Sequence, residues 1–428
     1  MFIYKLDKTA GWTVTSRNTF STVAVGNGLS KAYSGGTITL SKVDNAYTRN
    51  KDKDAMLAAA VRYGKESSNS KDFCILEIAD SHSDPVADQN SVLIANGFKY
   101  IDTLVHCGDI CAEHATDFNS ETYSQLIACQ KPFYYVIGNH DVGNSYNVAE
   151  CIDNATVYTR FIKPLVDAGL VSEGEYQTGK NYYYHDFTAK KIRLICVYEY
   201  EDPNDLSSVD STRYRARRGS SVISQAQAEW FCDTLISTPS GYSVVVAMHT
   251  AFSKLAEADV TYKFTEASKS GADHTSRNFS TDFWADAVNA FVTRSSYTCD
   301  MVCTGESAYL NNSGTGKYYS FTKDFSSAVG SFLCFIGGHG HRDRIFVHPT
   351  YTYQKQVIVV CANTVNRGYA MYSDIRRTPE DSPSKDSLTA IGCDTANKKI
   401  RLVKIGVNVT ENMTYRDFEV INVAQTTP

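Results

Sequence analysis

Five short apolar runs follow one another along the chain, and each has the length of a buried strand. They span residues 73–79, 101–107, 133–137, 243–248 and 332–336. Helical stretches are predicted after the first two runs, at residues 86–97 and 119–130. Because strands that alternate with helices usually pair in parallel, this pattern predicts a layered α/β fold.

Further elements follow from hydrophobic periodicity and from turn and capping residues. Residues 182–187 and 192–198 flank a short polar turn and predict a hairpin. Ser224 begins an amphipathic stretch, which predicts a Ser-capped helix over residues 224–236. We also expect a helical region from Asp141 to about Gly169, a helix at 283–292, and a second set of strands at 345–347, 357–361 and 400–405.

The chain divides unevenly into an extension and a large domain. Residues 1–50 are rich in Ser, Thr, Gly and Asn, and the alternation over 37–41 predicts a strand, so we expect a small β-rich N-terminal extension. Asp52 or Asp54 can cap a helix over residues 55–62. Residues 51–428 then form one α/β domain. Within it we interpret the stretch at about 250–335 as an insertion near the mouth of a site, because it is long for a simple connection.

Composition limits the classes of protein that fit. The chain has 428 residues, of which 43% are hydrophobic, and its formal net charge of −5 disfavours broad nucleic-acid binding, which needs a basic surface. Five of the 12 cysteines lie in apolar runs, where a thiol acts as a small hydrophobe, so we expect reduced thiols. No signal-peptide pattern and no run of membrane-spanning length are found, and we expect a cytoplasmic protein.

The ends of the five apolar runs carry Asp, His and Asn side chains. These are Asp80, His82, Asp109, Asn139, His140, His249, His339 and His341. We expect them to meet, because the carboxyl ends of parallel strands share one edge of a sheet, where ligands bind. Carboxylate, imidazole and amide donors suit Mn²⁺, Fe, Zn²⁺ or Ni²⁺, and the absence of thiolates disfavours a structural zinc site. The set exceeds the needs of one ion and predicts two divalent metal ions.

The order of these residues resembles the calcineurin-like metallophosphoesterases. That family has Asp-x-His, Gly-Asp, Gly-Asn-His-Asp/Glu, a lone His and Gly-His-x-His, and this chain has Asp80-Ser-His82, Gly108-Asp109, Gly138-Asn-His-Asp141, His249 and Gly338-His-Gly-His341. The resemblance covers roughly residues 70–410. It implies a two-sheet sandwich with helices on the outside. It also implies one ion held by Asp80, His82 and His341, a second held by Asn139, His249 and His339, and Asp109 as the bridge between them.

The resemblance implies a reaction as well, the hydrolysis of phosphate esters by a hydroxide that two metal ions activate. Paired cations lower the pKa of bound water from 15.7 toward about 7 and neutralise phosphoryl oxygens. His140 is placed to steady the transition state or to protonate the leaving oxygen, an effect of about 10²–10⁴ in rate. Two interpretations of Asp141 stay open, since it can orient His140 or cap the next helix.

Two branches of the family carry residues that this chain lacks. Purple acid phosphatases have a Tyr three residues after the bridging Asp, where this chain has Ala112. Ser/Thr protein phosphatases continue with Asp-Arg-Gly, where this chain has Ala112-Glu113-His114. We therefore expect a phosphodiesterase rather than a monoesterase.

Three residues outside the family pattern are candidates for contact with a phosphate-ester substrate. His114 lies five residues past Asp109, on a loop that should face the pocket. Arg217 and Arg218 belong to the densest basic run, and either can grip a phosphate oxygen. A solvated loop is the alternative interpretation of that run.

Two other functions stay open. The chain can be a non-catalytic binding or structural protein that retains the fold, because its Ser/Thr-rich start and its end loosely resemble parts of enzymes from bacterial surfaces or prophage tails. A nuclease is the further alternative, because similar centres cleave nucleic-acid diesters in some relatives. All seven metal-binding positions and His140 are present, which favours catalysis.

Overall fold

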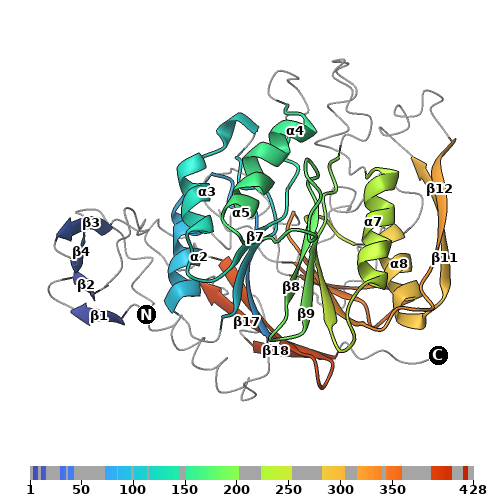
Figure 1. Cartoon of the computed structure of the whole chain (residues 1–428). Helices are drawn as coiled ribbons and strands as arrows, with labels where there is room; N and C mark the ends of the chain where they lie inside the picture. The colour runs from blue at the N-terminus through green and yellow to red at the C-terminus, as the bar shows by residue number, and fades with distance from the viewer. Residues whose placement is uncertain are drawn as a thin grey trace, which may run out of the picture.

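The computed structural model contains two six-stranded sheets, with helices on the outer sides of the pair (Figure 1). It describes residues 3–7, 11–15, 29–34, 37–42, 73–83, 85–97, 101–112, 115–143, 151–201, 223–252, 282–303, 316–339, 344–358, 387–406 and 418–422. The predicted two-sheet α/β sandwich is confirmed.

The first sheet has the strand order β18-β17-β16-β5-β6-β7. Its strands are β5 (Phe73–Ile78), β6 (Thr103–His106), β7 (Phe133–Tyr135), β16 (Ser387–Asp394), β17 (Lys399–Gly406) and β18 (Phe418–Asn422). The strands β5, β6 and β7 are parallel, as their alternation with helices predicts, and β16–β18 extend the sheet as antiparallel neighbours.

The second sheet has the order β14-β15-β13-β10-β9-β8. Its strands are β8 (Tyr183–Phe187), β9 (Ile192–Cys196), β10 (Ser243–Ala247), β13 (Ser331–Gly337), β14 (Arg344–Val347) and β15 (Lys355–Ile358). The predicted hairpin is the antiparallel pair β8 and β9. The strands expected at 345–347, 357–361 and 400–405 correspond to β14, β15 and β17, although residues 359–361 lie outside the described residues. The strands β14 and β15 join this sheet, whereas β17 joins the first.

The inner strands of the second sheet are buried on both faces. In β10, Val245 and Ala247 belong to a cluster that includes residues of both sheets. The alternate residues Val244 and Val246 belong to a second cluster with residues of α7 and α8. A strand covered on both sides needs apolar residues at every position, which explains why β10 appears as an unbroken apolar run in the sequence.

The described helices and helical turns are α2 (Pro85–Gly97), the 3₁₀ turn η2 (Ala115–Asp117), α3 (Ser120–Ile127), α4 (Asn154–Val157), the π-helical turn η4 (Tyr158–Ile162), α5 (Lys163–Asp167), α7 (Gln225–Ile236) and α8 (Phe283–Thr293). Side-chain caps satisfy the first backbone N–H groups of three helices, α3, α4 and α7. Asn119 caps α3 and Ser224 caps α7, the latter as predicted. No helix in the described part of the chain is both long and apolar enough to cross a membrane.

The helical region expected after Asp141 includes α4, η4 and α5. The first helix that the structure describes after Asp141 is α4, and its cap is Asp153, whose carboxylate accepts a hydrogen bond from the backbone N–H of Thr156 (2.7 Å). Gly143, between these two positions, packs so closely against Cys151 that an added Cβ would lie 2.6 Å from its sulfur.

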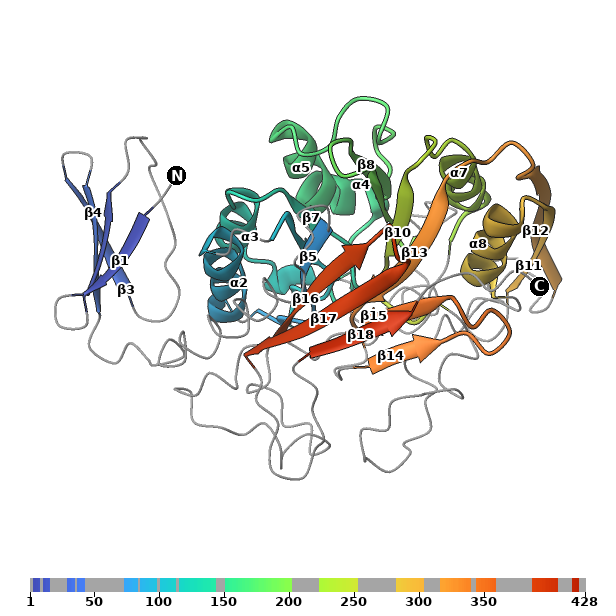
Figure 2. The ribbon, with the colours of Figure 1, turned by 90° about the horizontal axis from the view of Figure 1, so that it is seen from below.

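The N-terminal part of the chain forms a separate four-stranded antiparallel sheet of order β1-β2-β4-β3 (Figure 2). Its strands are β1 (Ile3–Asp7), β2 (Gly11–Thr15), β3 (Leu29–Ser34) and β4 (Thr37–Lys42). The expected β-rich extension and its strand at 37–41 are confirmed. The helix expected over 55–62 lies outside the described residues. The division at residues 50 and 51, and the insertion at about 250–335, stay predictions.

A hairpin that periodicity alone did not predict lies beside α7 and α8. It joins β11 (Ser296–Cys303) to β12 (Gly316–Asp324). In β11, Cys299 and Met301 are buried against the outer cluster while Asp300 between them is exposed. This alternation is the signal for a half-buried strand, but it covers few residues.

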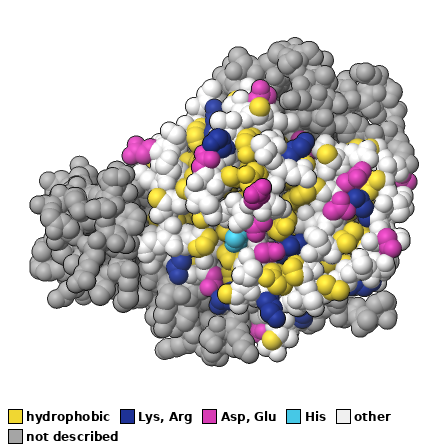
Figure 3. All heavy atoms as spheres, in the orientation of Figure 1, with side chains coloured by type: hydrophobic (Ala, Val, Ile, Leu, Met, Phe, Trp, Pro, Cys, Tyr) yellow, Lys and Arg dark blue, Asp and Glu magenta, His cyan; other side chains and the backbone are white. Residues whose placement is uncertain are grey.

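On the face of the molecule in Figure 3, the described acidic and basic side chains are interspersed.

Arg193 forms a buried ion pair that joins β8, β9 and the end of α7. Its guanidinium is 3% exposed and binds both carboxylate oxygens of Asp186 at 2.7 and 2.8 Å. It also donates to the carbonyl of Thr234 (2.8 Å) and lies over the ring of Tyr184 (4.1 Å). We expect Arg193→Met to lower the free energy of unfolding by about 3 kcal/mol, because Asp186 would lose its partner in a largely buried place.

Denaturant unfolding measures this change, and Lys163→Met is the control. Lys163 forms an exposed ion pair with Asp167 on α5, and such pairs contribute little. An equal loss of stability in both variants would contradict the role given to Arg193.

Candidate metal centre

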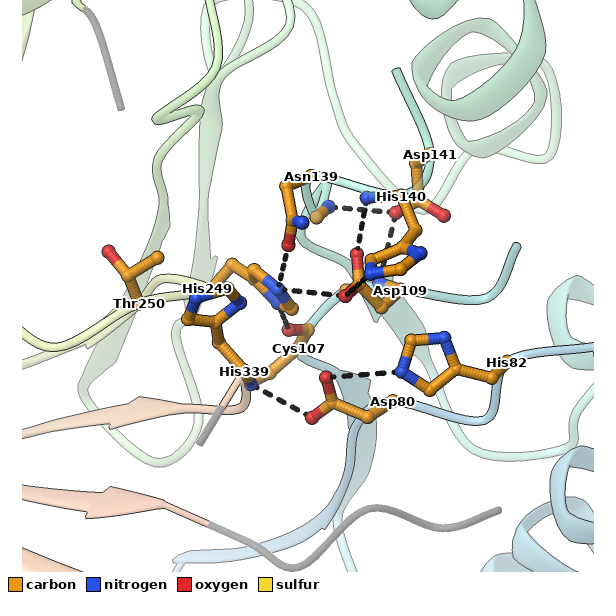
Figure 4. Close-up of polar contacts among 12 residues, drawn as sticks. Asp80, His82, Cys107, Asp109, Asn139, His140, Asp141, His249, Thr250 and His339 are labelled. Carbon is orange, nitrogen blue, oxygen red and sulfur yellow. Dashed lines mark hydrogen bonds and ion pairs between the residues drawn. The ribbon is translucent and has the colours of Figure 1, made fainter. Parts of the chain in front are cut away.

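The predicted ligand residues follow strands of both sheets, at the carboxyl ends of those strands (Figure 4). Asp80 and His82 follow β5, and Asp109 follows β6. The pair Asn139 and His140 comes just after β7 in the same sheet. His249 and His339 follow β10 and β13 of the second sheet. The predicted residues His341, His114, Arg217 and Arg218 lie outside the described residues.

Two overlapping groups of side chains have the geometry to hold a metal ion. The first contains His82, Asp109 and His140, and the second contains Asp109, His249 and His339. Within each group the ligand atoms all lie within 4.8 Å of one another. Asp109 is common to both groups, and a carboxylate has two oxygens that neighbouring ions could share.

Asp109 is held in place by one oxygen and directs the other toward the histidines. Its Oδ1 accepts a hydrogen bond from the backbone N–H of His140 (2.8 Å). Its Oδ2 is buried and lies 3.2 Å from Nε2 of His249 and 3.8 Å from Nε2 of His140. A buried carboxylate oxygen of this kind needs a cation.

The charges of the centre perturb the pKa values of its members. Burial alone would raise the pKa of the Asp109 carboxyl, but His249, His140 and His82 hold it well below its usual range. Burial alone would lower the pKa of His249, yet the carboxylates of Asp109 and Asp80 and the carbonyl of Cys107 raise it to about 10. Both shifts have the same origin, the attraction between the Asp109 carboxylate and the imidazoles that face it.

Two histidines have their ring orientation set by backbone carbonyls. His82 directs Nδ1 at the carbonyls of Cys111 (3.2 Å) and Ala112 (3.1 Å), and His249 directs Nδ1 at the carbonyl of Cys107 (2.6 Å). A carbonyl only accepts, so Nδ1 donates in both rings, and Nε2 is the ring nitrogen that a metal ion could take in place of a proton. In His249 that atom also lies 3.1 Å from Oδ1 of Asn139.

Asp80 links the two sheets at the centre. Its Oδ2 accepts a hydrogen bond from the backbone N–H of His339 (2.9 Å), and its Oδ1 lies 3.9 Å from Nε2 of His82. The rings of His249 and His339 also meet edge to face, with centroids 5.0 Å apart. The ligands that follow β5, β10 and β13 are therefore joined by direct contacts.

The loops that carry the ligands adopt a strained backbone. Asp80, His82, Asp109 and His339 have φ values of 56°, 45°, 59° and 62°. This left-handed conformation costs a non-glycine residue about 1–3 kcal/mol and persists only where the surroundings enforce it. Hydrogen bonds between the loops do so here, from Asp80 N–H to the Gly108 carbonyl (2.9 Å) and from His82 N–H to the Asp109 carbonyl (3.0 Å).

Three glycines of the sequence pattern are explained by close packing between these loops. A Cβ on Gly108 would lie 2.5 Å from Nδ1 of His249, and one on Gly138 would overlap Asp109. A Cβ on Gly338 would lie 2.7 Å from Oδ2 of Asp80. Each glycine precedes a predicted ligand or its neighbour, so the ligands can approach one another only because these side chains are absent.

Asp141 binds backbone N–H groups of the ligand loops, a role that the sequence did not suggest, and the orientation of His140 by Asp141 stays a prediction. Its carboxylate accepts hydrogen bonds from the backbone N–H groups of Asp109 (3.0 Å), Cys111 (3.1 Å) and Gly138 (2.7 Å), and from the hydroxyl of Tyr135 (2.5 Å). Capping of the next helix is wrong for α4, whose cap is Asp153. Asp141 instead fixes the backbone on both sides of the shared ligand.

Other buried polar groups, which no sequence motif marks, also support the ligand loops. The Ser81 hydroxyl bonds the carboxylate of Asp88 (3.2 Å) and lies 3.2 Å from Nε2 of His106, whose Nδ1 accepts from Gly108 N–H (3.2 Å). The Asp-x-His block carries Ser81 between its two ligands, but nothing in the sequence pairs this residue with α2. Glu199 is a further case, beside His249.

The donors present fit divalent metals that prefer nitrogen and oxygen. Burial raises the pKa of the Cys107 and Cys111 thiols well above the usual value, so neither offers a thiolate near the centre. Imidazole, carboxylate and amide groups make up the described donors of the centre, and this set suits Mn²⁺, Fe, Zn²⁺ or Ni²⁺.

Comparison with known proteins agrees with this geometry. Residues 74–305, more than half of the chain, match the model of the calcineurin-like phosphoesterases. The chain belongs to this family of metal-dependent phosphoesterases, as the order of its motifs suggested. No curated protein sequence matches the chain significantly.

Several solved structures are similar to this chain at low sequence identity. A dimetal phosphatase from Danio rerio is 11% identical, with 82% of this chain and 99% of that chain covered and a TM-score of 0.43. Phosphopantetheinyl hydrolase from Mycobacterium tuberculosis is 13% identical, with 73% and 95% covered and a TM-score of 0.36. GAP50, the anchor in the inner membrane complex of Plasmodium, is 9% identical, with 83% and 90% covered and a TM-score of 0.36.

The shared position of Asp109 leads to a prediction about metal content. We expect Asp109→Asn to lose one or both metal ions and nearly all activity, because an amide removes the negative charge common to both groups. Elemental analysis of the purified variant measures the loss.

Asp102→Asn is the matched control for this variant. Asp102 lies just before β6, at the opposite end of the strand that leads to Asp109, and its carboxylate accepts from the backbone N–H of Cys74 (2.8 Å). We expect the control to retain its metal. A full metal complement in Asp109→Asn would contradict the bridging role.

Proposed function

We propose that this member of the calcineurin-like phosphoesterases is an enzyme that hydrolyses phosphate diesters with two divalent metal ions. The observation that supports the proposal is the overlap of two ligand groups at the carboxylate of Asp109. A structural site would need only one closed set of ligands around one ion. Two sets that share an oxygen donor suit a pair of ions about 3.5–4 Å apart, as in two-metal phosphoesterases.

We assign the ligands by the family pattern. Asp80, His82 and His341 would hold one ion, Asn139, His249 and His339 the other, and Asp109 both. Divalent ions bound in this way would activate water as a nucleophile at neutral pH and neutralise the charge of the phosphoryl oxygens. The carbonyls that bond His82 and His249 keep their Nε2 atoms directed at the centre, and this orientation lowers the cost of assembling the site.

His140 is our candidate for the general acid. Its backbone N–H is bonded to Asp109, and its ring meets the ring of His82 edge to face with centroids 4.7 Å apart. At 8% exposure it is one of the more accessible imidazoles of the centre, which suits a group that must give a proton to a leaving oxygen. The rival assignment is a metal ligand, because His140 also belongs to the group with His82 and Asp109.

The preference for diesters is supported by the residue three positions after Asp109. Purple acid phosphatases carry a tyrosine there, whereas this chain has Ala112, whose carbonyl accepts from His82. The chain thus lacks the phenol of that branch, and it also lacks the Asp-Arg-Gly continuation of the protein phosphatases. His114, Arg217 and Arg218 remain our candidates for contact with the substrate.

A direct assay tests the proposed function. We expect protein stripped with a chelator to hydrolyse bis-p-nitrophenyl phosphate only after Mn²⁺ is added, and to hydrolyse p-nitrophenyl phosphate more slowly. Faster turnover of the monoester would refute the diester preference alone. No turnover of either compound with Mn²⁺, Fe²⁺, Zn²⁺ or Ni²⁺ would refute the enzyme and favour a binding protein.

Replacement of His140 separates its two possible roles. We expect His140→Ala to retain its metal ions and to lose about 10²–10⁴ in kcat, the usual contribution of a general acid. Metal content and turnover are measured on the same preparation. His185→Ala is the control, because His185 lies in β8 and pairs with Glu175 (3.0 Å) outside the centre, and we expect it to leave kcat unchanged. A metal-free His140 variant would show that His140 is a ligand.

A further inference from the structure

Glu199 is a fully buried carboxylate beside His249 that no motif in the sequence marks. It lies three residues past β9, the strand that pairs in parallel with β10. Its Oε2 accepts hydrogen bonds from the backbone N–H groups of His249 (2.7 Å) and Thr250 (2.9 Å), and its Oε1 accepts from the Thr250 hydroxyl. All three of these donors therefore belong to the two residues that begin the loop after β10.

These bonds set the position of the His249 backbone, while other contacts orient its ring. The Cys107 carbonyl bonds Nδ1, and the ring of Tyr200, the residue after Glu199, meets the imidazole edge to face at 6.0 Å. With backbone and ring both held, Nε2 lies 3.2 Å from Oδ2 of Asp109 and 3.1 Å from Oδ1 of Asn139. Figure 4 shows Thr250 directed away from this meeting point.

We propose that Glu199 is a positioning residue for one of the two metal sites, the site that takes His249. The inference rests on the proposed function, because it requires two metal ions with separate ligand sets. Glu199 would act through the backbone of His249 and would touch neither ion nor substrate. Its replacement should therefore weaken one metal site much more than the other.

The choice of a carboxylate supports a role beyond filling space. A buried carboxylate is costly unless each of its oxygens is satisfied, and an apolar side chain of similar volume would avoid that cost. A carboxylate offers only acceptors, so both oxygens can bind the loop at once. Groups that orient metal ligands through hydrogen bonds typically contribute about 10–100-fold to metal affinity.

Glu201 provides a matched control two residues farther along the chain. It is also a buried carboxylate, and it accepts hydrogen bonds from the backbone N–H of Ser224 (2.8 Å) and from Nε2 of Gln227 (2.9 Å). These partners belong to the start of α7 and to no ligand loop. Loss of Glu201 should therefore reduce stability without selecting between the metal sites.

The experiment measures Mn²⁺ binding to full-length, chelator-treated protein by calorimetry. We expect the wild-type protein to bind two Mn²⁺ ions and Glu199→Ala to bind one of them about 10–100-fold more weakly, with the other affinity nearly unchanged. We expect Glu199→Gln to lose less, because the amide oxygen can still accept from His249 N–H. Glu201→Ala should keep both affinities.

The outcomes separate this inference from the proposed function. Equal weakening at both sites in Glu199→Ala, no weakening, or the same selective loss in Glu201→Ala would overturn the inference alone. A wild-type protein that binds fewer than two Mn²⁺ ions would overturn the proposed function and the inference with it. Should Glu199→Ala fail to fold, Thr250→Val removes one of the three bonds while retaining the volume of the side chain. Selective weakening at one site in that variant would support the inference, and unchanged affinities at both sites would overturn it.

Discussion

The structure depends on one requirement, that the carboxylate of Asp109 in one sheet reaches imidazoles of the other. Asp109 follows β6, whereas His249 follows β10 of the second sheet, and the two groups are 3.2 Å apart. Contacts that cross between the sheets maintain this approach, from His249 to the Cys107 carbonyl and from the His339 backbone to Asp80. An apolar cluster with residues of both sheets stabilises the packing of one sheet against the other.

The candidate centre is costly to build. Charged and polar groups are buried, and four of the ligand residues adopt a left-handed backbone. Buried carboxylates offset these costs by accepting hydrogen bonds from backbone N–H groups of the ligand loops. Asp141 holds the segments that carry Asp109 and Gly138, and Glu199 holds the segment that carries His249. Hydrogen bonds of this kind favour one arrangement of the candidate ligands.

The predictions from sequence succeeded where a local pattern decides the structure. Apolar runs became the strands β5, β6, β7, β10 and β13, and Ser224 caps α7 as its position before an amphipathic stretch suggested. They failed where a strand has few buried residues, as in the hairpin β11–β12. The sequence predicted strands near β14, β15 and β17, but it did not predict that β14 and β15 join the second sheet whereas β17 joins the first.

For the site, the sequence by itself predicted two things, the chemistry of the candidate ligands and their place after strands. It did so because residues with metal-binding side chains follow each apolar run, and because their order matches the family pattern. Which atoms face inward was decided only by the tertiary structure. The ring orientation of His82 depends on carbonyls about 30 residues away, and the role of Asp141 depends on N–H groups of the neighbouring loop. Glu199 carries no sequence signal, since the N–H groups that it binds lie about 50 residues along the chain and parallel strand pairing brings them beside it. Hydrogen bonds between distant segments leave no periodicity in a sequence, and only the packing of the two sheets brings them about.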